Sequence, residues 1–450
     1  MPEARSPQAV SADAYEPDNE PAQAKSIAVD GTPQEHTFYP SGDIDWVKFD
    51  AVAGKTYVIE TFQSGTDEVD THIGLYDDPS GDEPEPIREN DDKDWFNGDF
   101  YSKTRWIADE NGVMYVRVAE WYNDIGAYRI SVTEMDQPLI SFTPVEGADR
   151  YKTAIAASKN AFPSGANVAV IATGENFPDA LGGSALAGAA GGPILLTPKN
   201  SLPADVLTEI KRLQVKDICI LGSTSAVSAT VENALAATLG SGHVFRIAGT
   251  DRYDTANQVA AEAIEILGSD YEGEVFVATG ANFPDALGAS PLAAVGVTPV
   301  VLARPGASTV ALPPEVEVAI IVGGENVVSP TIEANLHKQL DTPEGSMVFR
   351  IAGNDRYETT ALVAEVGYFA GLIWDGVGIA TGANFPDALA AGPALATKET
   401  VLLLTRPDAL PPITALALDC YRDDIEQVHF FGSAAAVSER VRNQVKAVLN

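Results

Sequence analysis

The sequence contains very little cysteine and histidine. Among its 450 residues are two cysteines, Cys219 and Cys420, and five histidines that stand singly along the chain. Two cysteines are too few for a framework of disulfide bonds or for a zinc site built from thiolates. The His-Glu-x-x-His spacing of many metalloproteases is also absent. Composition therefore excludes two common ways of stabilising or activating a secreted protein.

The sequence also lacks a long apolar segment and an excess of positive charge. Its longest uncharged run, residues 180–198, contains five glycines and Pro193, so we expect helix, turn and strand there and no transmembrane segment. Lys and Arg number 29 against 64 Asp and Glu, a net charge of -35. This charge argues against binding to nucleic acid or to an anionic membrane surface. Residues 1–5 lack the apolar core of a signal peptide, so the signal of an exported protein would lie outside this numbering.

Charge and residue pattern divide the chain into two unlike parts. Residues 1–140 contain 30 acidic and 10 basic residues, whereas residues 141–450 contain 34 and 19. In the first part apolar and polar residues alternate in short runs, as in Trp46-Val47-Lys48-Phe49, between clusters of Gly, Asp, Asn and Pro. This pattern predicts an antiparallel β-sandwich over residues 13–136. The polar segment 134–138 is the predicted linker.

The second part contains three copies of two motifs. One motif is Gly-x-Asp-Arg-Tyr and the other is Thr-Gly-x-Asn-Phe-Pro-Asp-Ala-Leu. Their copies begin at Gly147, Gly249 and Gly353 for the first motif and at Thr173, Thr279 and Thr381 for the second. A period of about a hundred residues exceeds a solenoid unit and is long enough for a small domain with its own core. We therefore predict three repeats, at residues 141–243, 244–346 and 347–450.

Helical and strand patterns alternate within each repeat. In the second copy, apolar residues from Tyr253 to Leu267 recur every three or four positions, which predicts an amphipathic helix. Residues 275–278, 299–302 and 319–322 are continuously apolar, as in strands that are buried on both faces. This alternation predicts an α/β fold in which helices cover a parallel sheet. Residues 349–352 are a further candidate strand.

Repeated polar residues follow these strands at the edge where open parallel sheets bind ligands. Each repeat places an asparagine before Phe-Pro-Asp-Ala-Leu, and these are Asn176, Asn282 and Asn384. Each amide could cap the following helix, whose first turn then contains the aspartate of the motif, or it could contact a ligand. The aspartate of each Gly-x-Asp-Arg-Tyr motif is a predicted helix N-cap, and these are Asp149, Asp251 and Asp355.

Two basic positions recur in the same loops. An arginine follows each predicted N-cap, at Arg150, Arg252 and Arg356. Each could pair with an acid of its own or a neighbouring repeat, or it could hold a phosphate or carboxylate group through its planar guanidinium. A second basic residue follows the second strand of each repeat, at Lys199, Arg304 and Arg406. These side chains could line an anion-binding groove or remain solvated.

The repeats show no recurring catalytic constellation. No nucleophile stands beside a histidine in all three copies, and Glu175 is replaced by Ala281 and Ala383. Catalytic groups would have to form such a constellation to act together. We therefore expect no enzymatic activity.

The three copies resemble the bacterial type-2 cell-wall-binding repeat over roughly residues 141–450. The resemblance implies three Toprim-like α/β units in a pseudo-threefold module. It also implies noncovalent attachment to an anionic polymer of the Gram-positive cell wall, a teichoic-acid-like or other secondary polysaccharide. The family's Pro-Ile-Leu-Leu motif, which is tied to polymer binding, matches residues 193–196. The recurring Asn, Arg and Lys residues named above are then the candidate polymer-binding residues.

The first part resembles the bacterial pre-peptidase C-terminal domain, a jelly-roll-like β-sandwich found in secreted enzymes. The likeness rests on Glu16-Pro-Asp-Asn19, Asp43-Ile-Asp-Trp46 and Gly126-Ala-Tyr128. Relatives in collagenases bind calcium through the first two segments. The resemblance therefore implies calcium as a cofactor and, as its ligands, Glu16, Asp18, Asp43 and Asp45.

Together these observations predict a secreted, nonenzymatic protein of the cell wall or cell surface. Its repeats would bind an anionic wall polymer and display the acidic sandwich, which could contact a protein partner. One alternative is a surface-layer or adhesive protein that acts through protein assembly. Another is a noncatalytic modifier of a wall hydrolase.

Overall fold

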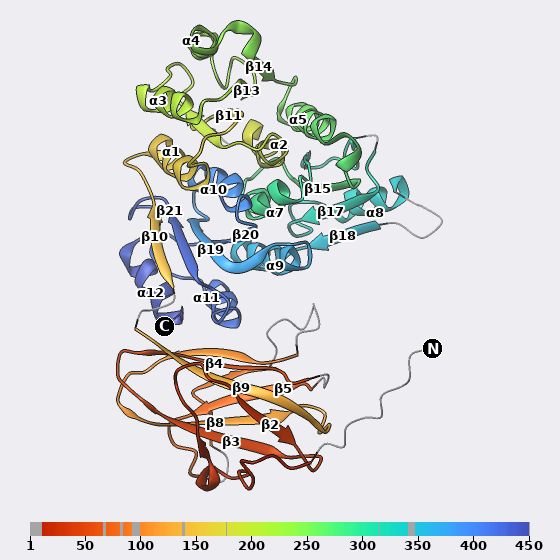
Figure 1. Ribbon diagram of the computed structural model, residues 1–450. Coiled ribbons are helices and arrows are strands. Elements are labelled where there is room, and N and C mark those ends of the chain that lie inside the picture. Colours follow the sequence, from red (N-terminus) through yellow and green to blue (C-terminus); the bar gives the residue numbers. More distant parts are fainter. Residues whose placement is uncertain are drawn as a thin grey trace, which may run out of the picture. The chain divides into compact units, whose positions relative to one another are not determined.

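The computed structural model describes residues 11–65, 69–81, 84–91, 100–136, 140–176, 178–313, 315–340 and 347–449. The chain divides into two compact units, and the division falls between residues 139 and 140 (Figure 1). Among the described residues, the first unit has strands and one short 3₁₀ helix, whereas the second unit alternates strands and helices. Of the predicted linker, residues 134 and 135 belong to the last strand of the first unit, and residues 137 and 138 lie outside the described residues.

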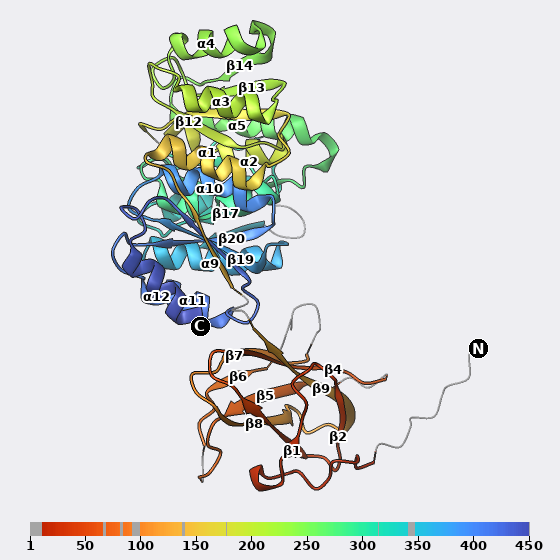
Figure 2. The same cartoon turned by 60° about the vertical axis from the view of Figure 1, so that its left-hand side comes forward.

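The first unit is a sandwich of two sheets (Figure 2). Its strands are β1 (Lys25–Ser26), β2 (Gln34–Phe38), β3 (Ile44–Ala51), β4 (Thr56–Gln63), β5 (Thr71–Tyr76), β6 (Arg88–Asn90), β7 (Lys103–Ile107), β8 (Gly112–Glu120) and β9 (Gly126–Met135). One sheet has the order β1-β3-β8-β5-β6 and the other has the order β2-β9-β4-β7. Neighbouring strands run antiparallel, as predicted, apart from the parallel pair β1 and β3.

Alternating residues of these strands fill the space between the two sheets. Val47 and Phe49 of β3 pack in one buried cluster with Tyr57 and Ile59 of β4. The residues between them, such as Lys48, face outward because successive side chains of a strand point to opposite faces. The period-two pattern of the sequence is therefore the pattern of this core.

The second unit contains twelve strands in three four-stranded parallel sheets, with helices between the strands. The described strands are β10 (Ser141–Val145), β11 (Val168–Thr173), β12 (Ile194–Thr197), β13 (Asp217–Leu221), β14 (Val244–Ile247), β15 (Glu274–Thr279), β16 (Val300–Ala303), β17 (Val318–Val322), β18 (Met347–Ile351), β19 (Ile373–Thr381), β20 (Thr400–Thr405) and β21 (Gln427–Phe431). The described helices are α1 (Arg150–Ala161), α2 (Gly183–Ala189), α3 (Ala204–Leu213), α4 (Ala229–Leu239), α5 (Arg252–Leu267), α6 (Pro284–Gly288), α7 (Ser290–Val295), α8 (Pro330–Gln339), α9 (Arg356–Phe369), α10 (Pro386–Ala396), α11 (Pro412–Cys420) and α12 (Glu439–Leu449). The predicted α/β alternation is confirmed.

The continuously apolar strands are buried on both faces. In β11, Val170 and Ala172 belong to a central core, while Ala169 and Ile171 belong to an outer core beneath α3 and α4. A strand with two buried faces needs apolar residues at every position, since its side chains alternate between the faces. This requirement explains the absence of alternation in the sequence.

Each sheet takes its fourth strand from the start of another predicted repeat. The sheet orders are β12-β11-β13-β14, β16-β15-β17-β18 and β10-β21-β19-β20. Strands β14 and β18 pair with β13 and β17, so the predicted boundaries at residues 244 and 347 separate two strands from the sheets that they complete. The third sheet is completed by β10, in which Val145 lies opposite Phe431 of β21. The first strand of the unit therefore belongs to its last sheet.

The three repeats share one core. Helices α2, α7 and α10 contact one another between the sheets (Figure 1). Small residues permit this approach, since a Cβ on Gly188 would collide with the backbone of Ala294, and one on Gly392 would collide with Ser290. One hydrophobic cluster runs through all three repeats. The prediction of a separate core for each repeat is thus only partly correct, because only the first and second repeats have separate outer cores.

Two further observations concern the predictions of the first paragraphs. Within the described part of the chain, no helix has both the length and the apolarity needed to span a membrane. Cys219 is buried in β13, whereas Cys420, at the end of α11, is exposed.

Candidate functional site

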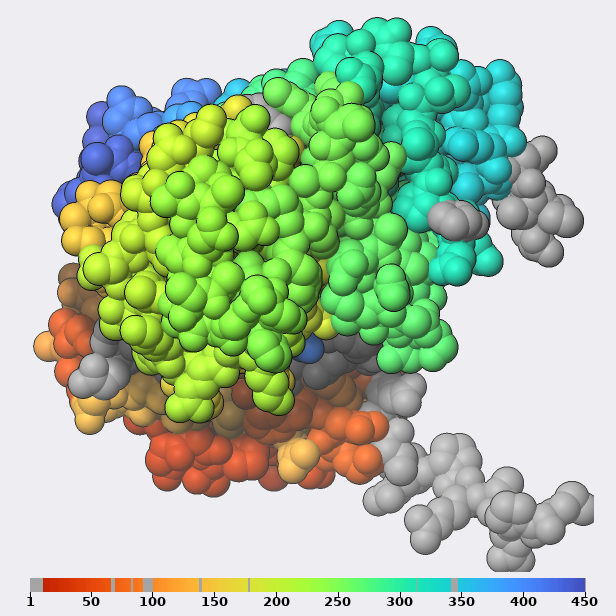
Figure 3. Space-filling view, turned by 90° about the horizontal axis from the view of Figure 1, so that it is seen from above, coloured from red at the N-terminus to blue at the C-terminus, as the bar shows by residue number. Residues whose placement is uncertain are grey.

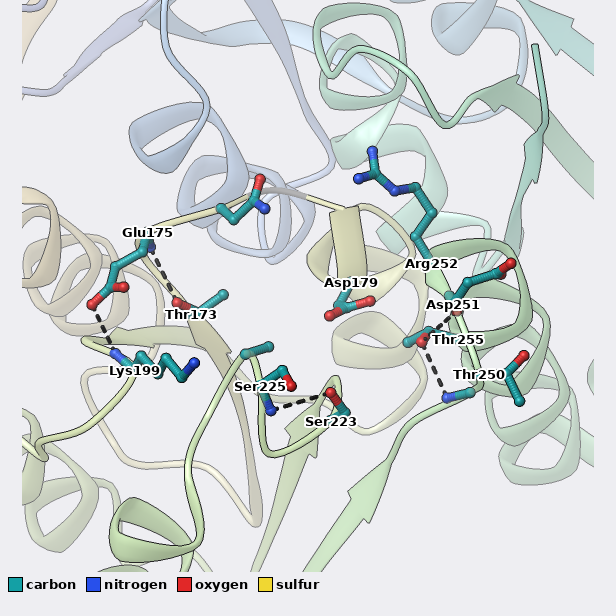
Figure 4. A pocket seen from close by; sticks show the side chains of 13 residues that line it. Thr173, Glu175, Asp179, Lys199, Ser223, Ser225, Thr250, Asp251, Arg252 and Thr255 are labelled. Carbon is teal, nitrogen blue, oxygen red and sulfur yellow. Dashed lines mark hydrogen bonds between the residues drawn. The ribbon is translucent and has the colours of Figure 1, made fainter.

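A polar pocket lies where the first repeat meets the second. It has a volume of about 640 Å³ and lies at the carboxyl ends of the strands of the first sheet. Its lining includes Lys199 and Glu175 from the first repeat and Asp251 and Arg252 from the second, with Asp179 between them (Figure 4). Figure 3 shows part of the first repeat in yellow-green beside the start of the second in green. The predicted residues Asn176, Lys199 and Arg252 all line this pocket.

Hydroxyl groups form much of the remaining lining. They come from both repeats and belong to Thr173, Ser223, Ser225, Thr250 and Thr255. Three carboxylates and two cationic groups accompany them, so the pocket is not strongly basic. Such a mixture of donors and acceptors suits a ligand that carries hydroxyl groups as well as charge.

Two kinds of local hydrogen bond occur where the loops of the pocket lead into helices. Asp149, Asp251 and Asp355 are the N-caps of α1, α5 and α9, and each accepts a backbone N–H of the first turn, which confirms the prediction. Two of the three predicted asparagine caps, Asn282 and Asn384, lie one residue before the N-cap of the helix that follows. Phe283 and Phe385 occupy the N-cap positions of α6 and α10, and the asparagine before each accepts the backbone N–H of that phenylalanine at 3.0 Å.

The aspartate of each Phe-Pro-Asp-Ala-Leu motif faces the next repeat. Burial raises the pKa of Asp179, while a hydrogen bond from Thr255 and the charge of Arg252 act in the opposite direction. Asp285 likewise faces Arg356. The corresponding residues of the third junction are Asp387, Thr153 and Arg150.

These contacts form a cycle, since the third repeat faces the first. Each aspartate also lies against a glycine of its own sheet, at Gly222, Gly323 and Gly432, where a Cβ would collide with the carboxylate. The backbone at these glycines has φ between 86° and 112°, a region that strongly favours glycine. The repeated aspartates therefore join neighbouring repeats.

Each arginine that follows an N-cap donates to a backbone carbonyl of its own repeat. Nη1 of Arg252 donates to the carbonyl of Gly280 at 2.8 Å, and Nη1 of Arg356 donates to that of Gly382 at 2.6 Å. Arg150 bonds to Gly174 in the same way, and its guanidinium lies over the ring of Phe385 in the third repeat. The structure thus places each arginine beside an acid of a neighbouring repeat, which was one of the two predicted alternatives.

The second set of basic residues, the rim residues, follows the second strand of each repeat. Arg304 pairs with Asp251 at 2.5 Å and lies 4.1 Å from the ring centre of Tyr253. Arg406 lies over Tyr357 in the same manner, at 5.5 Å. The backbone N–H of Lys199 donates to Glu175 at 2.9 Å, which fixes the loop that carries this lysine. Lys199 itself lines the pocket, and Arg304 contacts Asp251, which also lines it.

A further arginine links the fourth strand of each sheet to a neighbouring helix. The sequence analysis did not identify these arginines. Arg246 of β14 donates to the carbonyl of Gly222 and to Glu232, and Arg350 of β18 donates to Gly323 and Glu333. Pro144 occupies the equivalent position of β10. There, Arg442 of α12 supplies the guanidinium and donates to Gly432 and Glu146. The repeated Phe-Arg-Ile-Ala-Gly segment could have indicated the first two arginines.

Comparison with known proteins identifies the repeats. The family model of the cell wall binding domain 2 (CWB2) matches residues 145–232, 246–333 and 350–442, which together make up more than half of the chain. The chain belongs to the CWB2 family. The CWB2 region is therefore its cell-wall-binding part and places the chain at the cell wall or cell surface.

Two curated relatives come from Bacillus subtilis (strain 168). The chain is 30% identical over 307 residues to the N-acetylmuramoyl-L-alanine amidase LytC, a match that covers 67% of this chain and 57% of that protein. It is 30% identical over 301 residues to an amidase enhancer, covering 66% of this chain and 39% of that protein. The matches therefore leave a large part of each relative uncovered.

Solved structures from Clostridium difficile share the fold. Cwp8 matches with a TM-score of 0.60 and 25% identity, covering 69% of this chain and 52% of that one. Cwp6 matches with a TM-score of 0.61 and 20% identity, covering 95% and 67%. These likenesses accord with the three parallel sheets of the CWB2 region.

Outside the CWB2 region, the first unit gathers acidic residues at one place. Carboxylate oxygens of Glu16, Asp43 and Asp45, three of the four predicted calcium ligands, lie within 4.8 Å of one another. Burial, followed by the charge of Asp43, raises the pKa of Glu16. Asp18, the fourth predicted ligand, lies outside this group and faces His36, with 3.6 Å between its Oδ2 and the Nδ1 of the histidine. Sequence analysis did not identify His36.

Proposed function

We propose that the CWB2 region binds an anionic secondary polymer of the cell wall and that its binding sites are the junctions between repeats. The pocket at the first junction carries this proposal. It brings together three residues that the sequence had singled out separately, Asn176, Lys199 and Arg252. A site built from two repeats also explains why the repeats share one core. A ligand that contacts both repeats requires their relative positions to be fixed.

The lining of the pocket favours a charged polysaccharide, of teichoic-acid-like or other type, over a simple anion. Its hydroxyls can exchange hydrogen bonds with sugar hydroxyls, while Lys199 and Arg252 can pair with phosphate or carboxylate groups. Glu175 and Asp251 would reject a densely charged polyanion that offers no hydroxyl groups. The net charge of -35 makes such local pairing necessary, because the chain as a whole repels polyanions.

Further parts of the proposal concern the whole protein. We propose that it is secreted, that it has no catalytic activity of its own, and that it displays the acidic sandwich at the wall. We also propose a Toprim-like fold for each repeat and a pseudo-threefold arrangement of the three. The cyclic order of the contacts from Asp179, Asp285 and Asp387 supports that arrangement.

Cosedimentation of the full chain with purified cell walls tests the binding site. The test variant carries alanine in place of the rim residues Lys199, Arg304 and Arg406. A triple arginine variant is less suitable, because Arg252 and its equivalents also hold backbone carbonyls. The control variant carries alanine in place of the exposed lysines Lys211, Lys216 and Lys338.

We expect the rim variant to bind walls about tenfold or more weakly, since each charge-assisted hydrogen bond contributes about 1.5 kcal/mol or more. The control variant should bind like the wild type, and acid extraction of the secondary polymers should abolish binding by both. Equal binding by the rim and control variants would refute the proposed site. Binding that survives extraction would refute the proposed ligand.

The similarity to an amidase enhancer favours one second function, the noncatalytic modification of a wall hydrolase. Addition of the chain to a wall amidase would then change the rate of wall hydrolysis. A variant of the chain that no longer binds walls should lose this effect if the modifier acts through the wall. An unchanged rate with wild-type protein would exclude the function for that enzyme.

We also propose that Glu16, Asp43 and Asp45 bind calcium. Hard oxygen ligands at this spacing suit Ca²⁺. A ligand that binds only the folded state stabilises it, so millimolar calcium should raise the melting temperature of the wild-type chain and not that of an Asp43→Asn variant. An equal shift in both proteins would place the calcium elsewhere.

A further inference from the structure

A second cluster in the first unit combines a histidine with carboxylates. Nitrogen or oxygen atoms of Asp13, His36 and Asp45 lie within 4.8 Å of one another. His36 and Asp45 are fully buried, as is Asp18 beside them. Both oxygens of Asp18, Oδ1 of Asp45 and Nδ1 of His36 have no hydrogen-bond partner in the described part of the chain. Four buried polar atoms without a partner are unusual, because desolvation of each one costs free energy.

The hydrogen bonds around His36 settle which of its nitrogens carries the proton in the neutral ring. The amide nitrogen of Gln34 donates to the carbonyl of Ser26 at 2.9 Å, so its oxygen is the atom 3.3 Å from Nε2 of His36. Nε2 must then be the donor, and Nδ1 carries a lone pair. That lone pair faces Oδ2 of Asp18 at 3.6 Å and Oδ1 of Asp45 at 3.8 Å. The lone pair and two carboxylate oxygens in a buried space are an unfavourable arrangement unless a proton or a metal cation lies between them.

The distances within the cluster suit a shared metal ion better than direct contact. Separations of 3.6 and 3.8 Å exceed a hydrogen bond. Two ligands bound to one zinc ion at about 2.0 to 2.1 Å in tetrahedral geometry are about 3.3 Å apart. The histidine nitrogen and each of these two oxygens are therefore only a few tenths of an ångström farther apart than two ligands of one ion.

Neighbouring groups already orient these side chains. The hydroxyl of Tyr128 donates to Oδ2 of Asp45 at 2.8 Å and leaves Oδ1 turned toward the histidine. The ring of His36 is stacked on Tyr15, with 4.5 Å between the ring centres. Asp13 accepts the backbone N–H of Thr37 at 2.7 Å. Outer contacts of this kind fix ligands in many metal sites.

We infer that His36, Asp13, Asp18 and Asp45 bind a divalent ion of the first transition row, with Zn²⁺ as the representative ion. Imidazole nitrogen together with carboxylate oxygen suits zinc and its neighbours, whereas calcium takes oxygen ligands. Asp45 also belongs to the group with Glu16 and Asp43, so the two ions would meet at this residue. The site is independent of cell-wall binding.

Metal binding by the full chain tests this inference. The chain is stripped of metal with a chelator and titrated with Co²⁺, whose visible absorption reports the ligands, and with Zn²⁺ by calorimetry in the presence of millimolar Ca²⁺. His36→Asn removes the imidazole. His72→Asn is the matched control in the same unit, where His72 lies 3.8 Å from Glu89 and outside the cluster. Gln34→Ala changes an outer contact and spares the ligands themselves.

We expect one zinc ion per wild-type chain and a cobalt spectrum that zinc abolishes and calcium does not. An outer contact is worth about 10- to 100-fold in metal affinity. Gln34→Ala should therefore bind zinc about tenfold more weakly, and His36→Asn at least about 100-fold more weakly, while His72→Asn binds like the wild type. Full competition by calcium would show that the cluster is an ordinary calcium site. Absence of zinc binding would show that a proton, and not a metal ion, lies between His36 and the carboxylates. Unchanged affinity in Gln34→Ala and His36→Asn would refute the ligand set.

Discussion

Acid will weaken the third sheet of the CWB2 region through His429. This histidine lies in β21 between Thr143 of β10 and Gly378 of β19, and it is 4% exposed. Its Nε2 is 3.5 Å from Nζ of Lys398. Burial, together with the charge of this lysine, lowers the pKa of His429 to about 4 from an ordinary value of 6.5. The folded sheet therefore holds the neutral ring.

The expected loss follows from the difference between these two pKa values. Because the pKa is lowered in the folded state, the unfolded chain binds the proton more readily between pH 6.5 and pH 4. The stabilisation is complete above pH 6.5 and declines as the pH falls. The full difference corresponds to about 3 kcal/mol, of which about 2 kcal/mol is lost at pH 5.

Hydrogen exchange measures this loss where it occurs. Peptides that cover β21 should exchange faster at pH 5 than at pH 7 after correction for the intrinsic rate. His429→Ile, which installs the residue of the second repeat at this position, Ile320, should remove the extra pH dependence. His243→Gln, at a side chain that is more than half exposed, should keep it. Equal pH dependence in the wild type and His429→Ile would refute the assignment to His429.

The junctions of the CWB2 region give three further predictions. Arg442→Glu should lower the free energy of unfolding in urea by about 3 kcal/mol, and the added change Pro144→Arg should recover most of it by rebuilding the arrangement of the other two sheets; no recovery would show that the sheets are not equivalent. Gly222→Ala should lower the melting temperature, since its backbone and its surroundings both exclude a Cβ, whereas Gly242→Ala has open space and should melt like the wild type. Burial raises the pKa of Asp387, so its contribution to stability declines as the pH rises through that pKa. Asp387→Asn should therefore gain melting temperature relative to the wild type between pH 4 and pH 7, and a constant difference would contradict this.

Local features of the fold could be predicted from the sequence because they depend on neighbouring residues. The N-cap aspartates bond to backbone groups within three positions, as Asp251 does to Asp254. The buried strands, such as Val275 to Ala278, are apolar at each position, whichever elements they pack against. The helix that begins at Arg252 follows from residues three or four positions apart. Each of these signals lies within a short segment.

Strand partners, and sites whose residues lie far apart in the sequence, could not be predicted in the same way. Nothing local in residues 141–145 indicates that β10 pairs with β21, which is more than 280 residues away. His36 stands alone in the sequence, and only the sandwich brings it to Asp18 and Asp45. Arg442 has its role because Pro144 occupies the position of β10 that is an arginine in β14 and β18. Such relations arise from tertiary structure, and a single sequence does not record them.

The pairing of β10 with β21 restricts how this region can evolve. In an open solenoid, repeats can be added or lost at an end because each repeat contacts only its neighbours. Here the first strand completes the last sheet, so loss of the last repeat would leave β10 without β21 and β17 without β18. The region therefore has no terminal repeat that can be lost without breaking these strand pairs, whereas the position of the chain ends is less restricted. A duplication that moved the start of the region to another junction would preserve every sheet.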